Sequence, residues 1–523
     1  MMMSLMRNSM GDFSVLRDFL MAKNVFTPMP VMLGRREIVT DAEVIDESNL
    51  LDELVKALSI HNQNRTEIQY LWNYYRGEQP ILFKKKKIRP EINNKIVVNR
   101  ANEIVTFKTG YLAGEPITYV STGDNEKVMK NIKILNDAMY TLGKAPQDKA
   151  LVEWDMICGT AYRYISTEEV GDIPFKTYTL DPRDTFVVYS SDISHKRKFG
   201  VHYYFKAGST KVPVVGNGLY KDVVYEVYTE NAYYRIEDGR IVESKPHYLG
   251  AVSIVEYKAN NARQGAFEIV LPLLDALNAA YSDRLDAVDS FVQSFMKFVN
   301  VDIDGDGINL LREYGAIKFK SEPNLPADVE LISSELNQDQ TQTMVNSIDA
   351  QINVICGLPN RNGGSSTSDT GRAVELRDGF VSAEIQAKAS ETQFREDDKE
   401  ALEIIFKICE MKHFCSLKVS DVKAQFTRRN YDNLQSKSQV LIAMLQNNMI
   451  DPKLAFECSG MFTDPESAFI SSMKYHQEQV ELAKEMTPTP ETGSGSEQRS
   501  SKNANNEGTT ISNPILKSAS ETH

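Results

Sequence analysis

The sequence predicts an α+β fold in which a β-rich block is set between two helical regions. Eight short segments between Ala161 and Tyr257 are rich in aromatic and β-branched residues. Turn signals such as Asp181-Pro182 and Asp238-Gly239 separate them. Because these strands follow one another without intervening helices, we expect an antiparallel sheet rather than an alternating α/β arrangement. Helical periodicity dominates before and after the block, and 523 residues suffice for about two to four domains.

Net charge, apolar runs and cysteine number limit the kinds of protein that this chain can be. The net charge of −13 argues against non-specific wrapping of nucleic acid, which needs a basic surface to displace counterions. It is compatible with an acidic wall that DNA slides past, and equally with ordinary solubility. No apolar run is long enough for a membrane span, and the Met-rich N-terminus has no apolar core typical of a signal peptide. Five scattered cysteines favour a reducing compartment.

The N-terminal region is expected to begin with a weakly ordered arm over residues 1–45. Apolar spacing then predicts one helix over 48–62 and a second that starts at Asn64 and stops at Gly77. The four lysines 84–87 are either a phosphate-binding patch or a solvated loop, and we favour the loop. The pattern up to the β-rich block predicts these further elements: helices 99–112, 125–142 and 146–158, and a strand over 116–121.

A helix is predicted from Phe267 to Val299, where apolar residues recur with a period of 3.6. Its acidic residues lie largely off that stripe: Asp275, Asp283, Asp286 and Asp289. A small insert over 300–336 follows. Within the insert, Asp302, Asp304, Asp306, Gly307 and Glu313 fit the EF-hand calcium-loop pattern. Position 8 of that loop is Asn309 instead of an apolar residue, and no second loop is present, so we favour a simple acidic turn.

The stretch from Asn337 to Cys415 begins with a polar helix and a Gly/Ser-rich loop, 358–371. A long helix over 372–415 follows, which would span roughly 66 Å. Beyond it we expect a strand within 416–428 and helices from 435 onward, two of them started by Asp451-Pro452 and Asp464-Pro465. Residues 487–523 have too little apolar content to fold and are expected to be disordered.

Motifs for catalysis are absent from the sequence. Neither a phosphate-binding loop nor a nucleophile elbow occurs, so we expect no enzyme activity and no cofactor. Cys409, His413 and Cys415 form a C-x3-H-x-C cluster, but a closed zinc site needs a fourth ligand. We therefore interpret the cluster as a helix end with core cysteines and predict no metal site.

Four passages, in this order, resemble the portal proteins of tailed bacteriophages. They are YLWNYYRGEQPIL with NNKIVVNRANEIVTFKTGYLAGEPITY, VSIVEYKAN, GGSSTSDTGRAVELR, and NNMIDPKLAFECSGMFTDPESAFISSMKYHQEQ. The likeness covers roughly residues 45–486 and is strongest to the head-to-tail connectors of long-tailed phages that infect Gram-positive bacteria. The resemblance implies a portal fold with an antiparallel β-rich and helical wing, a two-helix stem, a small α/β clip, a long wing helix and a helical crown. The implied divisions are: arm 1–45; wing 46–261; stem helices 262–299 and 337–357; clip 300–336; tunnel loop 358–371; long wing helix and strand 372–430; crown 431–486; tail 487–523.

The same resemblance implies a ring of about twelve subunits at one capsid vertex, through which double-stranded DNA is packaged and ejected. The implied partners are the terminase large subunit, the head-tail adaptor proteins, and the major capsid and scaffolding proteins. The protein would sit in the virion, and in the host cytoplasm during assembly, without contact to a membrane. The implied channel-loop residues are Asn360, Arg361, Asn362, Ser365 and Ser366; the implied clip residues that dock partners are Asp304, Asp306, Glu313, Lys318 and Lys320. The alternative is another virion structural protein with a calcium-binding loop.

Overall fold

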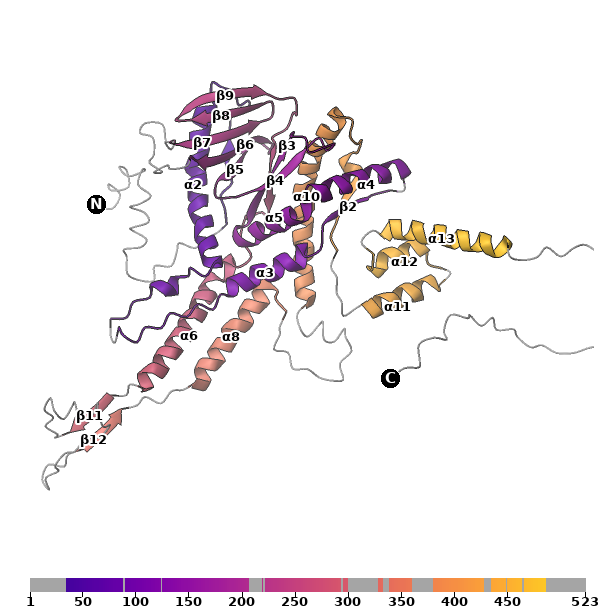
Figure 1. The fold of residues 1–523 in the computed structure, drawn as a ribbon. Helices are drawn as coiled ribbons and strands as arrows, with labels where there is room; N and C mark the ends of the chain where they lie inside the picture. The colour runs from indigo at the N-terminus through magenta and orange to yellow at the C-terminus, as the bar shows by residue number, and fades with distance from the viewer. Residues whose placement is uncertain are drawn as a thin grey trace, which may run out of the picture. The chain divides into compact units, whose positions relative to one another are not determined.

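The computed structural model of the chain confirms the α+β class (Figure 1). The chain forms two compact units, residues 1–464 and 465–523, and each is described by itself. In the second unit the described element is helix α13, Pro465–Glu485. The residues that the structure describes are 34–87, 90–123, 125–206, 219, 222–292, 295–299, 328–332, 338–359, 380–427, 434–447, 449–462 and 465–485.

A six-stranded sheet makes up most of the β-rich block, with the strand order β1-β5-β6-β7-β8-β9. All neighbours from β5 to β9 pair antiparallel, as expected, whereas β1 pairs parallel with β5. Buried residues of helix α2 pack on one face of this sheet and form a core with it. The strands are β1 (Val39–Thr40), β5 (Thr185–Ser190), β6 (Arg197–Phe205), β7 (Val223–Thr229), β8 (Ala232–Glu237) and β9 (Arg240–Pro246).

Three smaller sheets join segments that are distant in the sequence. A three-stranded antiparallel sheet has the order β10-β3-β4, and two-stranded sheets pair β11 with β12 and β13 with β2. The pairing of β13 with β2 brings residues near 120 and 424 side by side. The strands are β2 (Thr118–Ser121), β3 (Thr160–Ser166), β4 (Lys176–Leu180), β10 (Ile254–Lys258), β11 (Phe295–Val299), β12 (Asp328–Ile332) and β13 (Val422–Gln425).

The N-terminal helices differ from the prediction in one respect. The two helices expected on either side of residue 63 are a single helix, α2 (Leu50–Tyr75), because no residue in Gln63-Asn64-Arg65 forces the backbone out of the helix. Helices α3, α4 and α5 begin and end within two residues of their predicted bounds, and Asn99 and Asn125 cap α3 and α4 through their side chains. The remaining elements of this region are η1 (Pro80–Phe83), α3 (Arg100–Ala113), α4 (Glu126–Thr141) and α5 (Lys144–Cys158).

The arm predicted as weakly ordered is packed from Gly34 onward. Arg35 and Ile38 are buried, and β1 adds to the edge of the six-stranded sheet. The sequence did not indicate this, because the packing depends on residues far along the chain, such as Arg263 and Glu268. The first 33 residues lie outside the described part of the chain.

The helix predicted over 267–299 is shorter than expected. A 3-10 turn, η2 (Glu268–Val270), leads into α6 (Leu271–Val292), and the residues from Phe295 form strand β11. The prediction was wrong over 295–299, because these aromatic and β-branched residues pair with β12, from across the insert. A tertiary partner thus overrides the helical period.

Three more helical regions follow the insert. Helix α8 (Gln338–Cys356) confirms the predicted polar helix. The long helix is described as α10 (Phe380–Met411); it ends four residues before Cys415, because His413 adopts a left-handed backbone with a φ of 53°. Residues 372–379 lie outside the described part. The C-terminal elements of this unit are η3 (Val419–Asp421), α11 (Leu434–Leu445) and α12 (Pro452–Ser459), the last capped by the Asp451 side chain as predicted.

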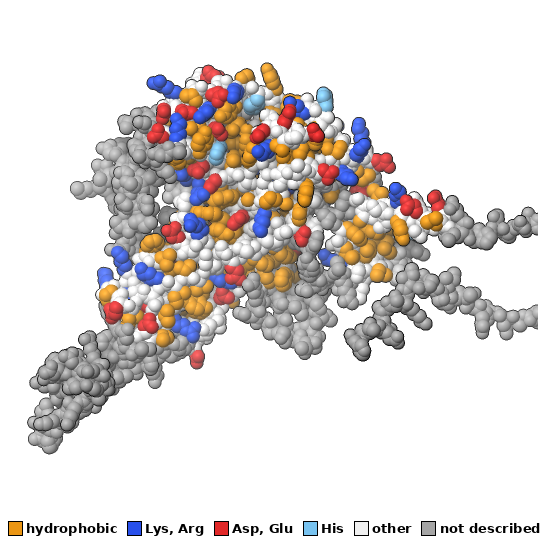
Figure 2. Space-filling model, in the orientation of Figure 1, with side chains coloured by type: hydrophobic (Ala, Val, Ile, Leu, Met, Phe, Trp, Pro, Cys, Tyr) orange, Lys and Arg blue, Asp and Glu red, His pale blue; other side chains and the backbone are white. Residues whose placement is uncertain are grey.

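Charges of both signs are interspersed on the face shown in Figure 2. Lysines and arginines alternate there with acidic side chains over the β-rich block and beside the helices. A mixed surface of this kind suits the solubility interpretation of the net charge at least as well as an acidic wall.

Candidate functional site

Helices α6 and α8 form an antiparallel pair, which is the feature on which the candidate site is built (Figure 1). Val345, Ile352 and Cys356 of α8 are buried in the same core as Leu274 and Leu277 of α6. Farther along the pair, Arg284 of α6 donates a 2.6 Å hydrogen bond to Gln342 of α8. The chain runs from α6 into β11 and the insert, and it returns through β12 into α8. The two helices are thus a hairpin, and the insert connects them.

A ladder of hydrogen bonds fastens α6 to the segment 94–98, which precedes α3. The backbone N–H of Asn94 donates to Asp286 Oδ1 at 2.7 Å. Two residues on, Ile96 N–H donates to Ser282 Oγ at 2.9 Å, and Val98 N–H then donates to Asn278 Oδ1 at 2.8 Å. We call these three pairs the root ladder.

The spacing of the root ladder follows from backbone geometry. Two residues of extended chain advance about 6.6 Å, and four residues of helix advance about 6 Å. Donors at every second residue of the segment therefore match acceptors at every fourth residue of α6. The three acceptors are polar yet almost fully buried: Asn278 and Ser282 are 0% exposed and Asp286 is 3% exposed. Sequence reasoning missed this face, because it searched the helix for apolar residues.

Asp286 is the most heavily used acceptor on α6. Besides the Asn94 backbone, it accepts from the Asn94 side chain at 2.9 Å and pairs with Lys84 and Lys86. Burial alone would raise the pKa of this carboxyl, but the bonds from Lys86, Asn94 and Lys84 outweigh burial and lower its pKa to about 2. Lys85 and Lys87 are exposed. Neither interpretation of the four-lysine run foresaw that two of its lysines bind α6.

Helix α8 exposes a polar face with little charge. Arg100 of α3 holds the helix through Asp349 at 3.2 Å and through Asn353, so that Asp349 is already paired. The large apolar residues exposed on it are Met344 in the first half and Val354 and Ile355 at the C-terminal end. The other exposed residues of this helix are Asp339, Gln340, Thr343, Asn346, Ser347, Ala350 and Gln351.

The end of α8, which precedes the predicted tunnel loop, contacts the second turn of α10, which follows it in the chain. Gln386, in the second turn of α10, donates to the carbonyl of Ile355 near the end of α8. Lys108 of α3 donates to Gln386 at 2.6 Å, and Tyr111 of α3 donates to Glu384 at 3.0 Å. Burial lowers the pKa of Lys108. Helix α3 is thus the platform that joins the end of α8 to the start of α10.

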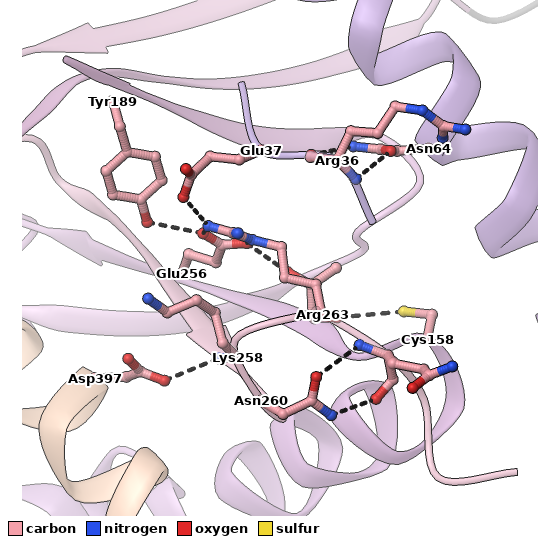
Figure 3. Close-up of polar contacts among 12 residues, drawn as sticks. Arg36, Glu37, Asn64, Cys158, Tyr189, Glu256, Lys258, Asn260, Arg263 and Asp397 are labelled. Atoms are coloured by element: carbon pink, nitrogen blue, oxygen red, sulfur yellow. Dashed lines mark hydrogen bonds and ion pairs between the residues drawn. The ribbon is translucent and has the colours of Figure 1, made fainter. Parts of the chain in front are cut away.

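The loop 259–266 joins strand β10 to α6, and we call it the elbow. Arg263 is its central residue (Figure 3). Its guanidinium donates to Glu256 at 2.8 Å and to Glu37 at 2.7 Å, and Tyr189 donates to the other oxygen of Glu256 at 2.8 Å. Burial would raise the pKa of Glu256, but the charge and hydrogen bonds of Arg263 lower it.

Backbone contacts clamp the elbow to helix α5. Ala259 N–H donates to Gly159 O at 3.1 Å, and Ala266 N–H donates to Met156 O at 2.8 Å. The approach is so close that a Cβ on Gly159 would lie 2.2 Å from the Arg263 carbonyl carbon, and one on Gly265 would lie 2.4 Å from Ile157 O. Only glycine fits at both positions.

The residues predicted for the channel loop and for partner docking lie outside the described residues. This holds for Asn360, Arg361, Asn362, Ser365 and Ser366, and for Asp304, Asp306, Glu313, Lys318 and Lys320. The calcium-loop pattern falls in the same undescribed insert. Among the described residues, no group of His, Cys, Asp and Glu is arranged to hold a metal ion.

Cys409 and Cys415 are buried in the hydrophobic core, as the interpretation of a helix end with core cysteines predicted. His413 lies in the turn between them. Within the part that the structure covers, no helix has both the length and the apolar character of a membrane span.

Comparison with known proteins identifies the family. Residues 56–488 match the model of a family described as phage portal protein, SPP1 Gp6-like. No curated protein sequence matched the chain. One similar solved structure is a chain from the neck of an empty GTA particle, with a TM-score of 0.39 and 12% identity over 69% of this chain and 90% of that chain. Another is from the virion of a native gene transfer agent particle, with a TM-score of 0.41 and 10% identity over 76% of this chain and 94% of that chain. Because the family match spans more than half of the 523 residues, the chain belongs to the SPP1 Gp6-like phage portal proteins.

Proposed function

We propose that this portal protein forms a ring of about twelve copies at one capsid vertex, and that double-stranded DNA enters and leaves the capsid through the ring. The family match over residues 56–488 carries this proposal. The α6–α8 hairpin supports it, because two packed helices that project an insert suit a channel stem with a docking module at its end. The ring itself is not expected to hydrolyse ATP, which would be the task of the terminase.

The exposed face of α8 is proposed as part of the channel wall. DNA carries one charge per about 1.7 Å of its axis, so a wall with many cations would hold it fast. Between residues 339 and 351 the exposed side chains of α8 carry no cation, and the charged one among them is Asp339. A polar wall of this kind would let DNA slide.

The loop 358–371 is proposed to reach into the channel, with Asn360, Arg361, Asn362, Ser365 and Ser366 as its DNA contacts. The insert would dock the terminase large subunit and later the head-tail adaptors, through Asp304, Asp306, Glu313, Lys318 and Lys320. The major capsid and scaffolding proteins would surround the ring in the virion. Arg100, Lys108 and Gln386 support the loop proposal, because they hold the end of α8 before the loop and the first described turns of α10 after it.

The oligomer is the decisive test of the proposed function. Electron microscopy of the purified protein, viewed end-on, together with native mass measurement should show closed rings of about twelve copies. A monomer or dimer under all solution conditions would rule the proposal out.

Arg361→Ala tests the loop. Rings should still assemble, but DNA packaging or retention should fall several-fold, because each copy loses its one cation within 358–371. Arg361→Lys is the matched control and should retain most of the packaging. Normal packaging by the alanine variant would remove the loop from the mechanism.

A further inference from the structure

The root ladder joins α6 to a segment that the rest of the fold also holds. Asn278 accepts from Val98 and donates to Gln79, which in turn donates to Asn99, the N-cap of α3, at 3.0 Å. Asn99 also donates to the carbonyl of Tyr75 at the end of α2. The end of α2, the first half of α6 and the start of α3 therefore share one polar network.

Movement of α6 along this segment would leave buried polar groups without partners. The N–H groups of Asn94, Ile96 and Val98 have their acceptors at Asp286, Ser282 and Asn278, and a shift by part of a turn would break all three bonds together. The three acceptors are almost fully buried, and a buried acceptor that loses its donor is costly to the fold. Lys84 and Lys86 add two charged bonds to Asp286, so the contact at Asp286 is the strongest of the three pairs.

The other end of α6 is equally constrained. The elbow enters α6 through backbone contacts with α5 that leave no space for a side chain at Gly159 or Gly265. Arg35 pairs with Glu268 in η2, and both side chains are almost fully buried. Helix α6 is therefore clamped at its start and again two to four turns later, on the same body of the fold.

From this double clamp we propose that Asp286 is a positioning residue of the portal. It makes residues 271–286 of α6 and the segment 94–98 move as one rigid body. DNA passage then leaves the root of the hairpin unmoved relative to α2, α3 and α5. The proposal rests on the proposed function, because it concerns what stays fixed while DNA moves through the ring.

A reversible covalent lock tests the proposal. The pair Asn94→Cys with Asp286→Cys in the full chain puts a thiol in place of each of two side chains whose Nδ2 and Oδ1 atoms lie 2.9 Å apart. Mild oxidation should join them within one subunit, and gels run with and without reductant measure the joined fraction. We expect oxidised rings to package DNA at least as fast as reduced rings, because the disulfide replaces the clamp that is lost with the Asp286 carboxylate. Arrest by oxidation that reductant reverses would overturn the proposal; the single-cysteine variants control for oxidation elsewhere.

The outcomes separate this inference from the function on which it rests. If the reduced double variant forms rings that package DNA, the proposed function stands. The packaging rate of the oxidised rings alone then decides whether α6 and the segment 94–98 move as one rigid body. If wild-type rings fail to package, the proposed function is at fault.

Hydrogen exchange provides a second measurement, which does not depend on how the double variant folds. The amides of residues 94, 96 and 98 should be equally protected in empty wild-type rings and in rings stalled with DNA; loss of protection on DNA engagement would contradict a rigid root. Asp286→Ala should speed exchange at residue 94 and slow packaging, and Asp286→Asn, which keeps one acceptor oxygen, should restore much of both. Equal packaging by wild type and Asp286→Ala would deny Asp286 a positioning role.

Discussion

Arg263 holds an unfavourable backbone conformation in the elbow, where the chain packs closely against α5. Its φ of 52° lies in the left-handed region, which costs a non-glycine residue about 1 kcal/mol or more. The side chain offsets this cost by pairing with Glu256 and Glu37 in a buried setting, while its backbone carbonyl accepts from Arg35. The conformation is thus maintained by residues on two separate stretches of chain, 35–37 and strand β10.

Asp397 on α10 predicts a pH dependence. Burial raises the pKa of this carboxyl from 3.8 to about 7, and its oxygens accept from Lys258 N–H at 2.8 Å and from Gln393 at 3.1 Å. The folded chain therefore binds more protons than the unfolded chain between these two pH values, and the stability that Asp397 contributes is lost as the pH rises toward 7 and above.

Asp397→Asn should remove this dependence, because an amide stays neutral and the Gln393 amide can turn to keep its bond. Urea unfolding measures the free energy of unfolding at each pH. Between pH 5 and pH 8 this free energy should fall by on the order of 2 kcal/mol more in wild type than in the variant. Asp398→Asn is the contrasting control: it weakens the buried pair with Arg163 and should destabilise at both pH values. An unchanged pH slope in Asp397→Asn would show that Asp397 is ionised in the folded chain.

Gly159→Ala should be among the most destabilising small substitutions in the chain. Its φ of 79° disfavours a side chain, and the added Cβ would lie 2.2 Å from the Arg263 carbonyl carbon. We expect a loss of about 2 kcal/mol or more in the free energy of unfolding. Gly110→Ala in α3 is the matched control: nothing lies within 4 Å of its Cβ position, so it should be neutral or stabilise by up to about 1 kcal/mol. Equal effects of the two variants would refute the close contact.

At the scale of elements, the strands were predictable and the ends of the long helices were not. Alternation and turn residues are local signals. Eight strands were predicted in the β-rich block, and the described residues from 160 to 258 contain the eight strands β3 to β10. Residues 295–299 have a helical period and also strand-forming residues, and only the pairing with β12 decides between them. The helix end at Met411 depends on the backbone of His413, which no residue pattern announced.

The candidate site was less predictable than the fold. The sequence indicated a helix pair, a loop and an insert, but it treated Asp286 as a residue off the apolar stripe. The burial of Asn278, Ser282 and Asp286 depends on N–H groups from a segment 180 to 192 residues earlier. One sequence carries no signal for pairing over that separation.

The alternation within the four-lysine run gives a prediction about this element. Lys84 and Lys86 pair with Asp283 and Asp286 of α6, whereas Lys85 and Lys87 are exposed. Alanine at 84 or 86 should cost about 1 kcal/mol in urea unfolding, and alanine at 85 or 87 should stay within about 0.5 kcal/mol of wild type. Four equal values would mean that the whole run is simply solvated.

At the scale of the molecule, the two larger hydrophobic cores and the elbow connect the parts of the fold. One core lies between α2 and the six-stranded sheet, and the other collects α3, α5, α6, α8 and α10. The hairpin thus belongs to the same core as the long helix on the far side of the loop. A force on the hairpin would therefore reach α10 through α3 and the close-packed side chains of the shared core.

A cation placed on the polar face of α8 tests whether that face lines the channel. Ser347 is exposed in the middle of the helix, and Ser347→Lys would add one positive charge per copy to the proposed ring. If the face meets DNA, packaging should slow several-fold at low salt and recover toward wild type as salt screens the phosphates. Ser347→Gln has a side chain of similar polarity without the charge, and it should package normally at all salt concentrations.

Equal packaging by the lysine and glutamine variants at low salt would place this face away from DNA. Rings of normal size in both variants would show that the substitutions do not affect assembly. The salt dependence is what distinguishes a channel wall from a subunit contact, because a lysine that disturbs packing between copies would lower the yield of rings and not the rate at which intact rings pass DNA.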